Sequence, residues 1–222
     1  VASKDNVKII FLNQYIKKEF SQVDIKNILL PSGVDLEIFN TLNKERRVSK
    51  KITFVGNLLR FGKERNLDTV INAFSSPKLK DYNLNIVGGP DNEANKIREL
   101  LLEKNISNIT VTGRLNRNEI VQELLSSSAG LLINTPDTHS KYFTSPLKYF
   151  EYLAVGLNVI AVDFPSHRVL PNQENIFYFE NNEDSLIQAV KDGCNSAFKE
   201  INLQEISLDT RAKKIIELFE SF

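Results

Sequence analysis

The sequence predicts an α/β protein built on a doubly wound parallel sheet, and three observations support this prediction. Short apolar runs alternate almost throughout with longer segments whose apolar residues recur at helical spacing. Many of the runs end at a glycine or a polar turn, as Ile52–Val55 ends at Gly56. No internal repeat or low-complexity segment interrupts the alternation. Strands that alternate with helices in this way form parallel sheets covered on both faces.

The expected strands are short runs of branched and aliphatic residues, which favour a buried pleated surface. Two of them come early in the chain, and the turn Pro31-Ser32-Gly33 separates them from the rest. Strands are expected at residues 7–12, 28–30, 51–55, 84–87, 109–112, 131–133 and 159–162.

The expected helices carry apolar residues three and four positions apart, which places them on one helix face. Leu67, Val70, Ile71 and Phe74 show this spacing most clearly. Helices are expected at residues 14–20 and 67–74, around residues 97–101 and 120–125, and at residues 147–154 and 208–222.

The composition disfavours several classes of protein. The 222 residues contain 28 Lys plus Arg and 28 Asp plus Glu, so the formal net charge is zero. This balance argues against nucleic acid as a partner. Cys194 is the only cysteine, which excludes an internal disulfide, and two histidines offer little for a metal site. No apolar run approaches the ~20 residues that span a bilayer. We expect a cytoplasmic protein that contacts the inner face of a membrane only peripherally, if at all.

Ligands of doubly wound sheets bind beyond the carboxyl ends of the strands. In this sequence those ends carry Gly56, Gly88-Gly89, Gly113 and Thr135-Pro136. Glycine allows a ligand to approach the backbone closely, but it is also an ordinary turn residue. No G-x-G-x-x-G follows any expected strand, so a generic dinucleotide binder is disfavoured.

Five segments form an ordered pattern along the chain, and one of them is Val111–Leu115, which contains a strand end at Gly113. Ile28–Asp35 contains PSGVD, and Thr53–Gly56 leads into the helix that ends at Phe74. Leu84–Gly89 reads LNIVGG, and Ser145–Ala161 contains EYLAVG and NVIA. In this order the segments resemble the retaining glycosyltransferases of the large GT-B-fold family four, whose signature is E-Y-L-A-x-G-x-P-V-I-A. The resemblance extends from about residue 7 to 222.

The resemblance implies a two-domain enzyme of which this chain is mainly the donor half. Residues 1–34 would be the remnant of an N-terminal acceptor domain together with the crossing segment. Residues 35–204 would form the nucleotide-sugar-binding domain, and residues 205–222 a helix that crosses back. The implied reaction transfers a sugar with retention from a UDP- or GDP-sugar to a saccharide or lipid-linked acceptor, as in polysaccharide assembly. It implies no obligatory metal and no cofactor, and the chain would be incomplete without the missing N-terminal domain.

By resemblance, Glu151 accepts hydrogen bonds from the ribose hydroxyls, unless it is a surface glutamate that the helix dipole favours. Arg65 stands where the family opens a helix with a phosphate-binding lysine. Arg60 and Lys63 share the loop after Gly56 with it, and guanidinium groups suit phosphate well. The alternative is a solvated basic loop.

Lys148 and the backbone from Ser145 through Pro146 to Leu147 could meet the phosphates at a helix N-terminus. Lys148 could equally be a solvated helix lysine. Arg114 and Leu115 follow the glycine at the end of their strand, where the family frames the base, although Arg114 could also be a surface residue. No catalytic residue is assigned.

Two positions depart from the family pattern. Phe143 stands eight residues before Glu151, where the family commonly has a glutamate that contacts the donor sugar. Asn57 occupies the position of a phosphate-binding arginine. His139 lies in a polar segment that could line the cleft, and neither it nor His167 is expected to be a catalyst.

Two other functions stay open. The chain could be a non-catalytic nucleotide-sugar-binding module in which Asn57 and Phe143 mark lost activity. It could also be a GT-B-fold nucleotide-sugar epimerase. Such enzymes use clustered carboxylates and histidines as acids and bases, and the sequence shows no such cluster.

Overall fold

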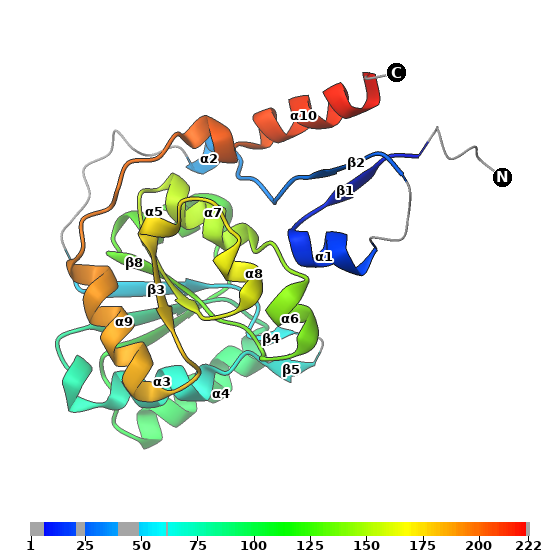
Figure 1. Ribbon diagram of the computed structural model, residues 1–222. Helices are drawn as coiled ribbons and strands as arrows, with labels where there is room; N and C mark the ends of the chain where they lie inside the picture. The colour runs from blue at the N-terminus through cyan, green and yellow to red at the C-terminus, as the bar shows by residue number, and fades with distance from the viewer. Residues whose placement is uncertain (1–6, 21–24, 40–48, 61, 221–222) are drawn as a thin grey trace.

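A six-stranded parallel sheet forms the centre of the molecule (Figure 1). The computed structural model describes residues 7–20, 25–39, 49–60 and 62–220. The strand order is β10-β9-β8-β3-β6-β7, and every neighbouring pair is parallel. The strands are β3 (Lys51–Val55), β6 (Asn83–Val87), β7 (Ile109–Gly113), β8 (Ala129–Leu132), β9 (Asn158–Val162) and β10 (Ile176–Phe179). This arrangement confirms the predicted fold class.

The strand order reverses between β3 and β8. The chain moves outward from β3 to β6 and β7, returns to the other side of β3 at β8, and continues to β9 and β10. In doubly wound sheets, such a reversal leaves a crevice at the carboxyl ends of the two strands involved. The topology therefore points to the ends of β3 and β8 as the place for a ligand.

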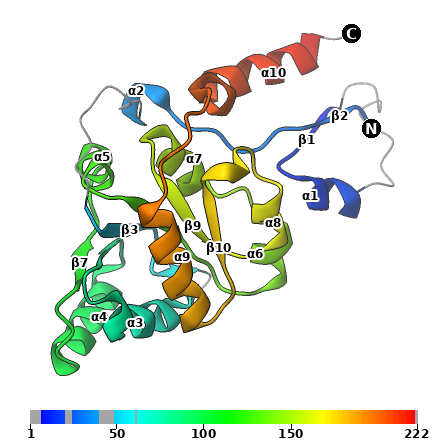
Figure 2. The same ribbon diagram turned by 60° about the vertical axis from the view of Figure 1, so that its left-hand side comes forward.

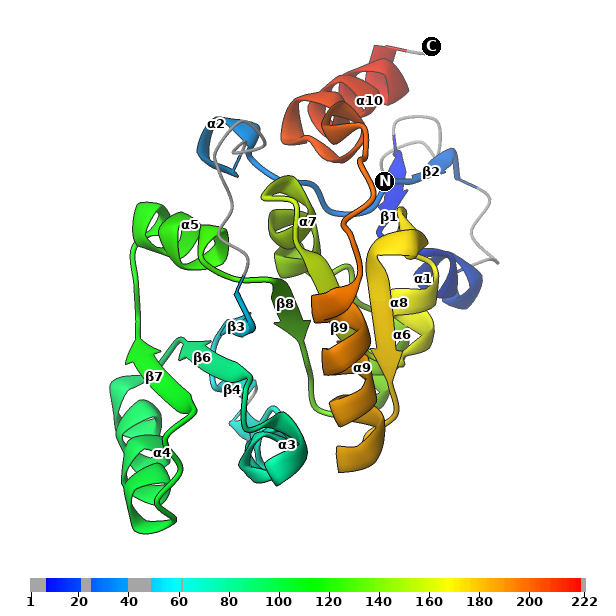
Figure 3. The same cartoon turned by 90° about the vertical axis from the view of Figure 1, so that its left-hand side faces the viewer.

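Helices cover both faces of the sheet (Figures 1 and 3). One face packs against α3 (Leu67–Ser75), α4 (Asp91–Glu103) and α9 (Glu183–Asn195), and the other against α5 (Arg117–Leu125) and α7 (Leu147–Ala154). Alternation along β3 divides its side chains between the two: Ile52 and Phe54 join the first core, and Val55 joins the second. Helices α6 (Thr138–Tyr142) and α8 (Pro165–Arg168) follow β8 and β9.

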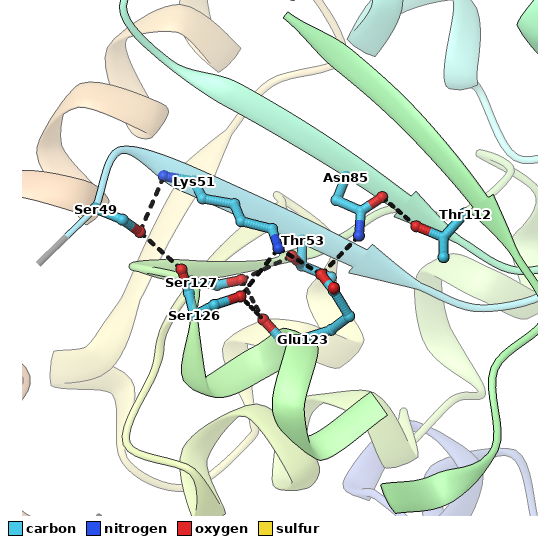
Figure 4. A network of polar contacts seen from close by, with 8 residues as sticks. All are labelled: Ser49, Lys51, Thr53, Asn85, Thr112, Glu123, Ser126 and Ser127. Atoms are coloured by element: carbon cyan, nitrogen blue, oxygen red, sulfur yellow. Dashed lines mark hydrogen bonds and ion pairs between the residues drawn. The ribbon is translucent and has the colours of Figure 1, made fainter. Parts of the chain in front are cut away.

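A polar network replaces apolar packing where α5 crosses the sheet (Figure 4). The carboxylate of Glu123 on α5 pairs with Lys51 and accepts a 2.7 Å hydrogen bond from the Asn85 side chain. Asn85 in turn accepts a 2.6 Å bond from the hydroxyl of Thr112 on β7. Because Glu123, Lys51, Asn85 and Thr112 lie on four different elements, the network fixes α5 against three neighbouring strands.

A smaller unit lies beside this sheet (Figure 2). The parallel pair β1 (Ile9–Phe11) and β2 (Asn27–Leu29) forms a separate sheet, with α1 (Gln14–Glu19) between its strands. The chain then passes α2 (Leu36–Phe39), and the last helix, α10 (Leu208–Glu220), returns to the same end of the molecule. The side chain of Arg211 on α10 donates a 2.9 Å hydrogen bond to the carbonyl of Pro31, which follows β2, and so joins this last helix to the early part of the chain. The domain boundaries at residues 34 and 204 stay predictions.

Several elements were not anticipated from the sequence. The basic loop after Gly56 is in fact the antiparallel hairpin β4 (Leu59–Arg60) and β5 (Lys63–Glu64). Strand β10, helix α9 and the short helices α6 and α8 were also missed. The 3-10 turns at Pro77–Leu79, Gln173–Asn175 and Leu203–Ile206 complete the element order. None of the helices in the described part of the chain combines the length and the apolar character that a bilayer crossing requires.

Candidate active site

A pocket of about 770 Å³ opens at the carboxyl ends of β3 and β8, where the strand order reverses. Residues that follow β3, β6, β7 and β8 contribute to its lining. The start of α7 forms another part of the wall. Of the sequence-predicted site residues, the pocket brings together Gly56, Arg65, Arg114, Leu115, Ser145, Pro146, Leu147 and Lys148.

The floor of the pocket consists of closely packed backbone. The amide of Leu58 donates to the carbonyl of Gly89 at 2.8 Å, and the amide of Gly88 donates to the carbonyl of Gly113 at 2.8 Å. A Cβ atom on Gly88 would lie 1.8 Å from the carbonyl oxygen of Gly56, so only glycine fits there. The strand ends are thereby held together with their backbone open to a ligand.

The pocket is cationic. Arg65, Arg114 and Lys148 line it, whereas none of its described lining residues is an aspartate or a glutamate. Arg65 is half-buried just before α3, and Arg114 is exposed and lies against Gly89, where an added Cβ would meet its side chain at 2.7 Å. Cations at partly enclosed positions stabilise a bound anion more strongly than surface cations do. The pocket is therefore suited to a phosphate-bearing ligand.

The N-terminus of α7 adds to the positive potential of the pocket. Ser145, Pro146, Leu147 and Lys148 all line the pocket, and no side chain caps the helix at Pro146. A helix N-terminus presents backbone N–H groups and the positive end of the helix dipole. The described geometry thus places a further anion-binding element beside the cationic side chains.

Tyr152 fixes α7 against both pocket strands. Its hydroxyl accepts a 3.0 Å bond from the amide of Val55 on β3 and donates a 3.2 Å bond to the carbonyl of Leu131 on β8. The ring lies where a Cβ on Gly130 would be, so the glycine makes room for it. Burial raises the pKa of the Tyr152 phenol well above its ordinary value, so the hydroxyl stays a donor.

Two predicted site residues whose side chains are described, Glu151 and Lys63, are not among those that line the pocket. Glu151 lies one helical turn along α7 and accepts a 2.6 Å ion-paired hydrogen bond from Lys148, with 15% of its side chain exposed. Lys63 is exposed on the hairpin, and Arg60 is on its other strand. The roles predicted for Glu151, Lys63 and Arg60 stay predictions.

Sequence reasoning left His167 out of the candidate site, yet this residue lines the pocket and is only 2% exposed. Its Nδ1 lies 2.8 Å from the carbonyl oxygen of Val162. Since a carbonyl only accepts, Nδ1 carries the proton and Nε2 is an acceptor. Burial lowers the pKa of His167 to about 4, so the ring is neutral at neutral pH. No sequence motif signalled this position.

The two positions that depart from the family pattern also line the pocket. Phe143 is half-buried and Asn57 is exposed. The ring of Phe143 lies 6.4 Å from that of His139 in an edge-on arrangement, and His139 lines the pocket from α6, as the sequence allowed. Leu12, from the smaller unit, is a further lining residue that was not predicted.

Two other observations bear on the chemistry. Cys194 is half-buried in α9, and burial raises the pKa of its thiol to about 12, which makes it a poor nucleophile. Within the described ranges, no three His, Cys, Asp or Glu side chains come together as metal ligands would.

The sequence matches the family model described as glycosyl transferases group 1 over residues 49–195. This match covers well over half of the chain, and the chain therefore belongs to that family. The matched region spans the large sheet and the pocket at its carboxyl edge. The sequence has no significant match among curated proteins.

Solved structures of glycosyltransferases share the fold. Sucrose-phosphate synthase from Thermosynechococcus elongatus superposes with a TM-score of 0.71 at 16% identity, over 96% of this chain and 57% of that one. Anabaena HepE, solved in complex with UDP and glucose, gives 0.67 at 14% identity, over 96% and 62%. A TarM variant from S. aureus, solved with fondaparinux, alpha-GlcNAc-glycerol and UDP, gives 0.70 at 15% identity, over 98% and 45%. The chain thus spans roughly half to three fifths of the length of these neighbours.

Proposed function

We propose that the chain binds the nucleoside diphosphate of a UDP- or GDP-sugar and forms the donor half of a retaining glycosyltransferase. The observation that carries this proposal is the cationic pocket without a described acidic lining residue, at the strand-order reversal of a sheet that belongs to a glycosyltransferase family. Two neighbours, HepE and TarM, were solved with UDP, which supports the choice of nucleotide.

Different residues of the site have different roles in the proposed reaction. Arg65, Lys148 and the N-terminus of α7 neutralise the pyrophosphate as negative charge develops on the leaving group. Leu115 and Arg114 contact the base, and Glu151 accepts hydrogen bonds from the ribose after its ion pair with Lys148 rearranges. A saccharide or lipid-linked acceptor approaches from the side of the smaller unit, whose Leu12 already lines the pocket.

The acceptor side of the cleft is the incomplete part of this proposal. We infer that a preceding N-terminal domain supplies it, because the chain spans so much less than the full length of its structural neighbours. In the cell, the complete protein would work in the cytoplasm, with at most peripheral membrane contact. No metal or cofactor is required in this proposal, since side chains and backbone amides stabilise the leaving group.

Calorimetric titration with UDP, GDP and NAD tests the proposal. We expect saturable binding of one nucleoside diphosphate and none of NAD. Arg65→Gln should weaken binding about tenfold or more, since charge-assisted hydrogen bonds contribute about 1.5–3 kcal/mol. Glu151→Ala should weaken it as well if the ribose role is correct. Lys104→Gln is the matched control, because it removes one exposed positive charge that is outside the pocket lining and was never a candidate site residue.

The comparison of the two variants distinguishes a specific contact between the nucleotide and the pocket from a general attraction to positive charge. Equal losses in Arg65→Gln and Lys104→Gln would indicate nonspecific attraction and contradict the assigned pocket. A folded wild-type chain that binds no nucleoside diphosphate would refute the donor-site proposal.

A non-catalytic nucleotide-sugar-binding module is the second candidate, and Phe143 favours it. This ring occupies the pocket at a position where the family commonly offers a carboxylate to the sugar. Donor hydrolysis by the chain joined to an acceptor domain would decide for the enzyme. Binding without turnover would decide for the module.

A further inference from the structure

One side chain of the smaller unit reaches into the wall of the pocket. The amide nitrogen of Asn13 donates to the carbonyl oxygens of Tyr142 at 2.9 Å and Thr144 at 3.0 Å. Its amide oxygen accepts from the backbone of Tyr15 and Ile16 and so caps α1. Asn13 is only 7% exposed. A single buried amide therefore joins two elements that lie about 130 residues apart in the sequence.

Ser32 makes a second connection to the same wall. Its backbone amide donates to the hydroxyl of Ser145 at 2.8 Å, and its own hydroxyl donates to the carbonyl of Ser145 at 2.8 Å. The ring of Tyr15 also meets that of Tyr142 edge-on at 5.5 Å. All these contacts fall within residues 142–145, which run from the last residue of α6 into the segment before α7.

The connected segment has little regular structure of its own. Residues 143–146 separate α6 from α7 and contribute Phe143, Thr144, Ser145 and Pro146 to the pocket lining. Apart from the contacts with the smaller unit, Thr144 bonds to Ser140 and Ser166 on neighbouring short helices. Backbone outside helices and strands keeps one conformation only where its polar groups are satisfied. The contacts from Asn13 and Ser32 meet this requirement.

We propose that Asn13 and Ser32 are positioning residues that hold the Phe143–Ser145 wall of the pocket in its ligand-binding conformation. The smaller unit is then a working part of the donor site, and its placement sets the affinity for the nucleotide. The link to affinity rests on the proposed function, whereas the holding of the wall does not. Asparagine suits this position because it donates two N–H groups to carbonyls while its oxygen still caps a helix.

Asn13→Asp separates the two tasks of this side chain. Aspartate caps a helix as well as asparagine does, but it has no N–H for the carbonyls of Tyr142 and Thr144 and presents a negative charge to them. We expect faster hydrogen exchange of the amides in residues 142–148 and about tenfold weaker binding of UDP. Ser32→Ala removes one of its two bonds to Ser145 and should weaken UDP binding about two- to threefold.

Asn182→Ala is the matched control, since Asn182 is not among the residues that line the pocket and caps α9 with an exposed side chain that accepts from the amide of Ser185 at 2.9 Å. It should lower thermal stability without changing UDP affinity or exchange at residues 142–148. Unchanged exchange in Asn13→Asp would overturn the positioning role, and so would faster exchange with unchanged UDP affinity. A wild-type chain that binds neither UDP nor GDP would overturn the proposed function, and faster exchange in Asn13→Asp would still support the holding of the wall.

Discussion

The imidazole of His167 shows how a single residue of the pocket couples stability to pH. Its Nδ1–H donates to the carbonyl of Val162, its ring stacks on Phe164 with 5.5 Å between centroids, and the side chain is almost completely buried. Desolvation lowers its pKa to about 4, although the hydrogen bond to Val162 and the nearby Asp163 act in the opposite direction. The folded protein therefore keeps the ring neutral where the unfolded chain would protonate it.

This difference predicts a loss of stability in mild acid. The folded pKa lies below the unfolded value of 6.5, so the unfolded state binds more protons between pH 6.5 and 4, and stability falls as the pH decreases through that range. From pH 7 to 5, His167 should cost about 2 kcal/mol of unfolding free energy. Urea denaturation of the wild type and of His167→Asn at both pH values measures it. Equal pH dependence in the two proteins would contradict the assignment.

At the same scale, Asn13 and His167 show what sequence reasoning could not supply. Each takes its role from partners that are unpredictable from local sequence: Asn13 from carbonyls about 130 residues away, and His167 from desolvation by the surrounding fold. By contrast, Gly56 and Arg65 were predicted to lie at the site because strand ends and helix starts are visible in the sequence. Lys63 could not be told from Arg65 because both belong to the same basic run.

At the scale of elements, the network around Glu123 holds α5 in place. The carboxylate is 28% exposed and pairs with Lys51, while the Asn85 amide that donates to it belongs to a residue only 5% exposed. Leu115 and Ile120, which precede Glu123 in the chain and flank the start of α5, line the pocket. The network thus supports a pocket wall from the far end of the helix.

Removing this carboxylate should destabilise the fold. Glu123→Ala leaves the buried Asn85 amide without its acceptor, which should cost about 1–3 kcal/mol of unfolding free energy. Glu119→Ala, in the exposed capping box at the start of the same helix, should cost about 1 kcal/mol or less. Urea denaturation compares the two. A smaller effect at Glu123 than at Glu119 would show that the network adds little.

The pattern of elements was predictable where periodicity is strong. Strand β3 and helix α7 were expected at their observed bounds, because a short run rich in branched and aromatic residues marks the strand and closely spaced apolar residues mark the helix. The β4–β5 hairpin was missed because its strands of two residues each are too short for any period to show. Strand β10 was missed although its IFYF segment is apolar and aromatic throughout, so the signal for a strand was present in the sequence.

At the scale of the whole molecule, the chain consists of two parts, and the sheets of these parts differ in how well other elements cover them. The large sheet is covered by helices on both faces, whereas β1 and β2 form only a two-stranded sheet in which Leu29 is 47% exposed. The described contacts around the junction of the two parts include those of Asn13 and Ser32, the Val34–Ser207 bridge and the contact of Arg211 with Pro31. Two-stranded sheets are marginally stable by themselves.

This imbalance predicts the order in which the molecule opens. Local unfolding begins where few apolar groups are buried, so the amides of β1 and β2 should exchange with solvent well before those of β3, β6 and β8. Native-state hydrogen exchange measured by mass spectrometry would resolve the two sets. Because residues 142–145 hydrogen-bond to the smaller part, their amides should exchange together with β1 and β2 rather than with the neighbouring helix α7. If β1 exchanged as slowly as β3, the two parts would form one cooperative unit, and the pocket wall would not depend on a separately opening neighbour.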